Sequence, residues 1–127
     1  MNNKGQVLVM FVIFIPIFLI ILVLLIDISN LFLTNNEIND ISYTVLEYGL
    51  DNIDKNNVIT TSKELFLANK KEASIDLLEI KDNKIYLNVS YHVKGIISDI
   101  VDIKAFDINN KYVAYIDGDK KIIERIK

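Results

Sequence analysis

The sequence predicts an α+β protein in which a long amino-terminal helix, half of it transmembrane, packs on a small antiparallel β-sheet. Two observations predict this class. Residues 7–26 form an uncharged stretch of twenty residues, eighteen of which are Val, Leu, Ile or Phe. Beyond it, apolar residues recur first at helical spacing and then, from residue 73, at every second position. About a hundred residues follow the stretch, enough for one small domain and not for two.

The apolar stretch predicts a membrane-spanning helix. Twenty helical residues extend about 30 Å, the thickness of the hydrocarbon core of a bilayer. A cleaved secretory signal has a shorter apolar region and a small-residue exit, and residues 26–30 (Ile-Asp-Ile-Ser-Asn) supply none. We therefore expect a retained anchor over residues 7–26. Lys4 precedes it and no Lys or Arg follows until Lys55, which predicts a cytoplasmic amino terminus and an extracytoplasmic remainder.

The same helix is expected to continue over residues 6–50, because neither Gly nor Pro occurs between residues 26 and 48. Its outer half carries an apolar stripe made of Leu31, Ile38, Ile41, Val45 and Tyr48. Either the rest of the domain covers this stripe, or the helices of identical or related subunits do. Gly49 is the expected C-cap, and a polar loop follows it.

Residues 51–127 are expected to form the α+β domain outside the membrane. Thr61 and Glu64 have the spacing of a capping box, which predicts a short helix from there to about Lys71. Residues 74–80 then predict a strand, residues 81–84 a hairpin turn, and residues 85–93, with strict alternation, a second strand.

The end of the chain predicts further strands. Residues 96–99 are expected to form a loop or a single helical turn, and alternation over residues 101–105 predicts a third strand. Asn109 and Asn110 predict a turn, residues 112–116 a fourth strand, and Asp117-Gly118 a sharp hairpin turn. Residues 121–126 are the candidate fifth strand.

Composition argues against several functions. The net charge is −3 and acidic residues gather just beyond the anchor, whereas nucleic-acid and polybasic lipid sites need clustered Lys and Arg. There is no cysteine, and a single histidine, His92 on the polar face of a strand, does not make a zinc site. Asp117-Gly118-Asp119 lacks the Glu that a calcium loop requires and is better explained as a turn. We expect no cofactor, no metal and no enzymatic activity.

A helix half in the membrane and packed on a small sheet is the layout of type IV pilins. Among these, the start Lys4-Gly5-Gln6-Val7-Leu8-Val9-Met10-Phe11, followed by Ile15-Pro16 and Ile26-Asp27, resembles the TadE-like family of the Tad (Flp-type) pilus machinery. The resemblance covers roughly residues 4–50. It implies a non-enzymatic, single-pass membrane protein of pilus assembly or of a related secretion filament. The implied partners are the membrane, other pilin-like subunits, the assembly machinery and a prepilin peptidase.

The resemblance also implies roles for particular residues. It places peptidase cleavage between Gly5 and Gln6, after a leader of residues 1–5; otherwise Gly5 merely ends that leader. The family's processed members carry Glu five residues after the cleavage-site Gly, where this chain has Met10. Met10 cannot make the intramembrane ion pair that such a Glu makes. This departure suggests an initiating or minor subunit, or an uncleaved component.

Eight residues are expected to contribute to helix packing: Met10, Pro16, Asp27, Leu31, Ile38, Ile41, Val45 and Tyr48. Pro16 either bends the helix for packing or is incidental. Asp27 either marks the membrane boundary or contacts a partner subunit. The alternative function is that of a single-span anchored binding module. An exposed aromatic patch, formed by Tyr86, Tyr112 and Tyr115, would favour it.

Overall fold

The computed structural model describes residues 3–101 and 106–126. It contains a four-stranded antiparallel sheet in the order β1-β2-β3-β4. The elements are α1 (Asn3–Asp51), α2 (Val58–Asn69), β1 (Ser74–Lys81), β2 (Lys84–His92), α3 (Ile96–Val101), β3 (Asp107–Asp117) and β4 (Lys120–Ile126). The 49 residues of α1 make a rod about 73 Å long. The predicted α+β class, a long helix packed on a small antiparallel sheet, is confirmed.

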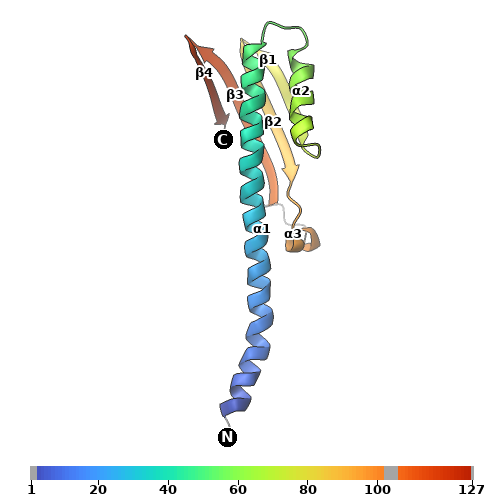
Figure 1. Ribbon diagram of the computed structural model, residues 1–127, viewed down its shortest axis with the longest axis vertical. Coiled ribbons are helices and arrows are strands. Elements are labelled where there is room, and N and C mark those ends of the chain that lie inside the picture. The colour runs from blue at the N-terminus through green and yellow to red at the C-terminus, as the bar shows by residue number, and fades with distance from the viewer. Residues whose placement is uncertain (1–2, 102–105, 127) are drawn as a thin grey trace.

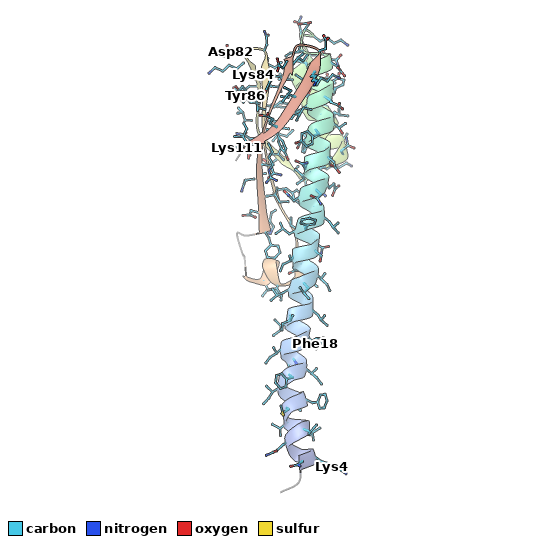
Figure 2. The ribbon with its side chains drawn as sticks, turned by 90° about the vertical axis from the view of Figure 1, so that its left-hand side faces the viewer. Lys4, Phe18, Asp82, Lys84, Tyr86 and Lys111 are labelled. Carbon is cyan, nitrogen blue, oxygen red and sulfur yellow. The ribbon has the colours of Figure 1, made fainter. Side chains whose placement is uncertain are left out.

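The outer half of α1, together with α2 and the sheet, forms two layers that we call the sheet domain (Figure 1). The two helices lie over one face of the sheet. Between the layers lies the core, which includes Ile38, Val45, Leu46, Phe66, Leu87, Val89, Tyr112 and Ala114, each at most 1 % exposed. Side chains such as Lys84, Tyr86 and Lys111 extend from the other face of the sheet, away from α1 (Figure 2).

The hairpin turns lie where the sequence predicts them. Asp82 and Asn83 connect β1 to β2 with positive φ angles of 54° and 62°, as a two-residue turn matched to the twist of the strands requires. Gly118, with φ 63°, opens the turn between β3 and β4. A β-bulge between Ile75 and Leu77 shifts the register of β1, so that both Ile75 and Leu78 face the core.

The second helix begins earlier than the capping-box pattern predicts. α2 starts at Val58 and ends at Asn69, so Thr61 lies inside the helix; its N-cap is Asn57, which makes no side-chain capping bond. Val58, Ser62 and Phe66 are its buried residues and share one face at a spacing of four. Burial of this face against the core outweighs the local capping signal.

Two predictions near the end of the chain are wrong. Val101, expected to open a strand, is the last residue of α3, while residues 102–105 of that expected strand lie outside the described residues. Asn109 and Asn110, expected to form a turn, lie within the continuous strand β3 and pair with Ser90 and Val89. In both places hydrogen bonds to α1, from the backbone of Ile96 and Ile97 and from the side chain of Asn110, outweigh the conformational preference of the local sequence.

Gly49 is not the C-cap of α1, because the helix continues to Asp51. It lies at a close approach between layers instead. A Cβ atom added there would lie 2.8 Å from Cδ1 of Ile85 in β2. The end of the Ile85 side chain thus occupies the space that a large side chain at this position of α1 would need.

Substituting Gly49 tests this close approach. Gly49→Leu is expected to destabilise the sheet domain by about 2 kcal/mol through overpacking. Gly49→Ala is expected to be nearly neutral, because the flexible end of Ile85 can move and alanine favours a helix by up to about 1 kcal/mol. Urea unfolding of the full chain in detergent micelles measures both. If leucine were tolerated as well as alanine, the close packing would be refuted.

Candidate functional site

The surface of α1 divides into two halves. From residue 7 to residue 22, and at Leu25 and Ile26, its side chains are exposed, while Val23 and Leu24 are partly buried. Over most of this length no other described element lies beside the helix (Figure 2). Met10 is 54 % exposed and Phe18 60 %. α1 is the one helix in the described part of the chain that is long and apolar enough to cross a membrane. An exposed apolar rod of this length is consistent with a single membrane anchor.

Pro16 lies inside this exposed half. A shallow apolar furrow lies on the surface of α1 around Pro16. It is lined by Phe11, Phe14, Ile15, Ile17, Phe18 and Ile21. Proline removes one backbone N–H and crowds the carbonyl one turn earlier. Three phenylalanines around such a site give a neighbouring apolar helix a surface of matching chemistry.

The packing residues expected in the outer half divide between core and margin. Ile38 and Val45 are buried in the core, while Leu31 and Ile41 are partly buried against it. Tyr48 is half-buried. The sheet and α2 of the same chain therefore cover this stripe, which was the first of the two alternatives. The stripe also includes buried Ser42, Leu46, Gly49 and Leu50, which the apolar pattern did not identify.

Asp27 joins the end of the apolar stretch to the sheet domain. Although it is charged, it is only 1 % exposed. Its Oδ1 accepts a hydrogen bond from the N–H of Ile96 and its Oδ2 from the N–H of Ile97, each at 2.9 Å. A carboxylate at the first turn of a helix satisfies N–H groups that lack partners within the helix. Asp27 thus holds α3 against α1 within the chain itself.

A partly buried polar cluster between the sheet and α1 joins β3 and β4 to α1. The Tyr112 hydroxyl donates to Oδ1 of Asn39, and Nδ2 of Asn110 donates to the Tyr112 hydroxyl, both at 3.1 Å. Asn110 Nδ2 also donates to Oδ1 of Asn35 at 3.0 Å, and Arg125 donates to Oδ1 of Asn110 at 2.6 Å. Burial raises the pKa of Tyr112, against the lowering effect of hydrogen bonds from Ser42 and Asn110. We call these five residues the polar cluster: Asn35, Asn39, Asn110, Tyr112 and Arg125.

Beside the polar cluster, an open groove of about 450 Å³ separates α1 from the β3–β4 side of the sheet. Leu31 and Phe32 line it from α1, and Ile108 and Arg125 line it from the strands. Phe32 is 66 % exposed. The groove is continuous with the apolar surface of α1, so it extends that surface into the sheet domain.

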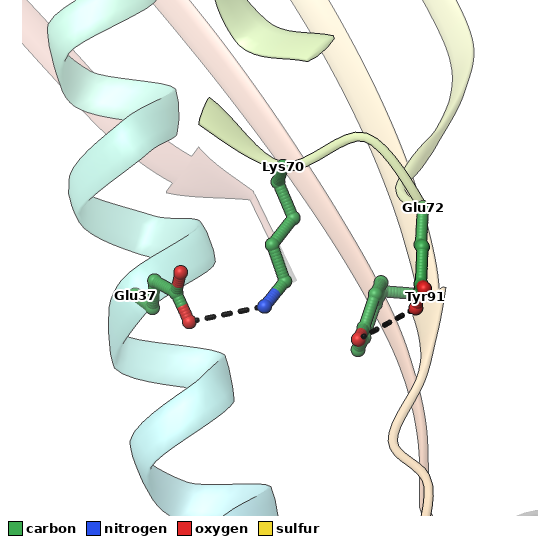
Figure 3. A network of polar contacts seen from close by, with 4 residues as sticks. All are labelled: Glu37, Lys70, Glu72 and Tyr91. Carbon is green, nitrogen blue, oxygen red and sulfur yellow. Dashed lines mark hydrogen bonds and ion pairs between the residues drawn. The ribbon is translucent and has the colours of Figure 1, made fainter. Parts of the chain in front are cut away.

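A second set of polar contacts ties α2 to its neighbours (Figure 3). Lys70 pairs with Glu37 of α1 at 3.1 Å and lies 4.8 Å from the ring centre of Tyr91 in β2. The Tyr91 hydroxyl donates to Glu72 at 3.4 Å. Pairs this exposed are each worth less than about 1 kcal/mol. They orient α2 rather than hold the domain together.

The remaining candidates do not assemble a reactive centre. His92 pairs with Asp107 across strands β2 and β3. Within residues 3–101 and 106–126, no three His, Asp or Glu side chains come together in a way that suits a metal ion. Tyr112 is fully buried, so it cannot belong to an exposed aromatic patch, and Tyr86 and Tyr115 are half-buried.

The sequence predicts the apolar stripe of α1 but not the hydrogen bonds by which α1 contacts α3 and β3. Asp27 is predicted to mark the membrane boundary or to contact a partner subunit, and Asn109-Asn110 to form a turn, whereas both positions contact other elements of the same chain. One signal was available: Asn35 and Asn39 are spaced by four, and Leu31 and Ile38 of the apolar stripe lie four and three residues from Asn35. Asparagines on a core-facing stripe require partners, and the β3 polar residues supply them.

Comparison with known proteins gives one family. Residues 5–45, nearly the whole of α1, match the family model described as TadE-like protein. No curated protein and no solved structure matches the chain.

Proposed function

We propose that this chain, TadE-like over residues 5–45, is a non-enzymatic, membrane-anchored pilin-like component of a Tad (Flp-type) pilus or a related secretion filament. The observation that carries the proposal is α1 itself. It is one unbroken helix whose first half is an exposed apolar rod and whose second half forms the core of a sheet domain. A pilin-like subunit needs this combination, because its anchor must pack laterally while its domain stays folded.

In this proposal the anchor, residues 7–26, packs against the helices of neighbouring subunits in the membrane. The hydrophobic effect contributes little between helices in lipid, so association relies on van der Waals packing and polar contacts. The furrow around Pro16 offers such packing. The groove beside the polar cluster would continue the contact outside the bilayer, with Leu31 and Phe32 as its apolar side chains. The amino terminus is cytoplasmic and residues 51–127 are extracytoplasmic.

The proposal includes processing at Gly5-Gln6, and the surroundings of Gly5 support it. α1 begins at Asn3, so Gly5 lies within the helix, where glycine is unfavourable relative to alanine. An added Cβ would meet nothing within 4 Å. Packing within the chain therefore gives no reason for glycine here, whereas recognition by a peptidase does.

Gly5→Val should leave the fold intact and abolish processing. In cells that contain the pilus machinery, mass spectrometry of the wild-type chain is expected to find Gln6 as the first residue, and Met1 in the variant. The matched control is Met10→Leu, an exposed apolar exchange that leaves Gly5 in place and should be processed. Retention of Met1 in the wild-type chain would remove the processed-pilin version and leave the anchored component.

Association with the machinery is the direct test of the function. Immunoprecipitation of the full chain from native membranes is expected to recover the pilus ATPase and the platform protein, and an unrelated single-span protein should recover neither. Recovery of neither by this chain would contradict the proposal. It would favour the anchored binding module, for which the open sheet face with Lys84 5.0 Å from the ring centre of Tyr115 is the available surface.

A further inference from the structure

α3 places apolar side chains outside the core of the sheet domain. Ile96 is 57 % exposed and Ile100 79 %, the latter the most exposed of the large apolar side chains that the structure describes. They lie four residues apart, so they share one face of the short helix. A soluble domain gains nothing from this arrangement, and an explanation must come from what lies next to the face.

The hydrogen bonds to Asp27 fix the position of α3 along α1. Because Asp27 holds the N–H groups of Ile96 and Ile97, α3 begins at the level where the apolar stretch ends. From Val7 to Asp27 the helix rises about 30 Å, which equals the thickness of the hydrocarbon core. Figures 1 and 2 show α3 beside α1, below the sheet and at the edge of the domain nearest the anchor.

The exposed surface of α1 at this level is apolar as well. Leu25, Ile26 and Ile28 are each more than half exposed. The face made by Ile96 and Ile100 therefore lies at the same level as exposed apolar surface of α1.

We propose that α3 is an interfacial foot, whose exposed face lies in the headgroup–acyl boundary of the bilayer. The occupant of this face is lipid, and the inference rests on the membrane anchoring proposed above. Short apolar helices of this kind insert about 5–10 Å into the boundary. We call the two hydrogen bonds from α3 to Asp27 the latch. Because the latch holds the foot against α1, the foot fixes the height and the tilt of the sheet domain over the membrane. An anchor of one helix alone would leave the domain free to tilt.

The chain has no tryptophan, so a single introduced one reports its own surroundings. Three full-length variants are reconstituted separately into phosphatidylcholine vesicles: Ile100→Trp in the foot, Phe18→Trp near the middle of the anchor, and Ile116→Trp in β3. Ile116, 49 % exposed, is the matched control at the far end of the domain. Quenching of the tryptophan fluorescence is measured with lipids that carry bromine either near the headgroup (shallow) or deep in the acyl chain.

We expect the tryptophan of Ile100→Trp to show blue-shifted emission and to be quenched most strongly by the shallow bromine. The tryptophan of Phe18→Trp should be quenched most strongly by the deep bromine, and that of Ile116→Trp by neither. An Ile100→Trp signal as unquenched as that of Ile116→Trp, with Phe18→Trp quenched, would overturn the foot and leave the anchor standing. A blue shift without quenching would show that protein covers α3, which also overturns it. Absence of quenching in Phe18→Trp would overturn the anchor and the foot together.

Discussion

Replacing Tyr112 by alanine is expected to lower the free energy of unfolding of the sheet domain by about 4 kcal/mol. Tyr112 is the largest fully buried side chain in the described part of the protein. Its ring meets that of Tyr43 edge to face, with centroids 6.0 Å apart, and its hydroxyl joins the polar cluster. Alanine would leave a cavity and remove the hydroxyl from Asn39 and Asn110. Thermal unfolding of the full chain in detergent micelles should show a fall in Tm of well over 10 °C.

Tyr112→Phe separates the two contributions. It keeps the ring and removes only the hydroxyl, so we expect a loss of about 1 kcal/mol. If phenylalanine were as damaging as alanine, the polar cluster would hold the layers together and ring packing would matter little. If alanine cost under 1 kcal/mol, the core assigned here would be wrong.

The same residue predicts a pH dependence at alkaline pH. Burial raises the pKa of Tyr112 in the folded state above its ordinary value of about 10. The unfolded chain therefore loses this proton first, and the stabilisation is present below about pH 10 and is lost as the pH rises through the folded-state pKa. Denaturant midpoints measured from pH 8 upward should fall less steeply for Tyr112→Phe than for the wild type. If the denaturant midpoints of the wild type and Tyr112→Phe fell equally steeply with pH, the burial of this hydroxyl would be contradicted.

Replacing Asp27 by alanine is expected to detach α3 from α1. Both carboxylate oxygens accept backbone hydrogen bonds, and bonds to a charged group are each worth about 1.5–3 kcal/mol. We expect local stability at α3 to fall by about 3 kcal/mol, which is roughly a hundredfold faster hydrogen exchange at the amides of Ile96 and Ile97. The strands should be much less affected.

Asp27→Asn is the matched control for this latch. It has nearly the same shape but retains a single oxygen acceptor and no charge, so its exchange rates should lie between those of the wild type and Asp27→Ala. Exchange at Ile96 and Ile97 that is unchanged in the alanine variant would contradict the latch.

The parts of the fold that sequence predicts are those set by neighbouring residues. The rod α1 follows from an uninterrupted helical pattern, and the β1–β2 hairpin from alternation around Asp82 and Asn83. α3 follows only in part: the sequence predicts a loop or a single helical turn at residues 96–99, and the helix extends to Val101. The hydrogen bonds that hold its start come from a carboxylate sixty-nine residues earlier in the chain, at Asp27, which no local pattern reveals.

The same reasoning applies to the candidate site. Ile38 and Val45 were identifiable because apolar residues on a helical stripe seek burial. Ser42 was not, although it is buried: its hydroxyl donates to the carbonyl of Ile38 at 2.7 Å, which lets a polar side chain lie on a core-facing stripe. Asn110 lies on the core face of β3 because it alternates in step with Ile108 and Tyr112. Its hydrogen-bond partners there, Asn35 and Arg125, come from other elements, and no local pattern encodes them.

The central claim is that α1 is one continuous rod, lipid-facing over residues 7–26 and core-forming beyond Asp27. Because the chain has no cysteine, single cysteines carrying nitroxide labels can be placed at successive positions from residue 8 to residue 48. In vesicles at low protein density, collision with oxygen should be high at every position to residue 22, and beyond it should vary with a period of 3.6 residues. Contact with an aqueous nickel chelate before residue 26, or a break in the helical period near residue 27, would contradict it.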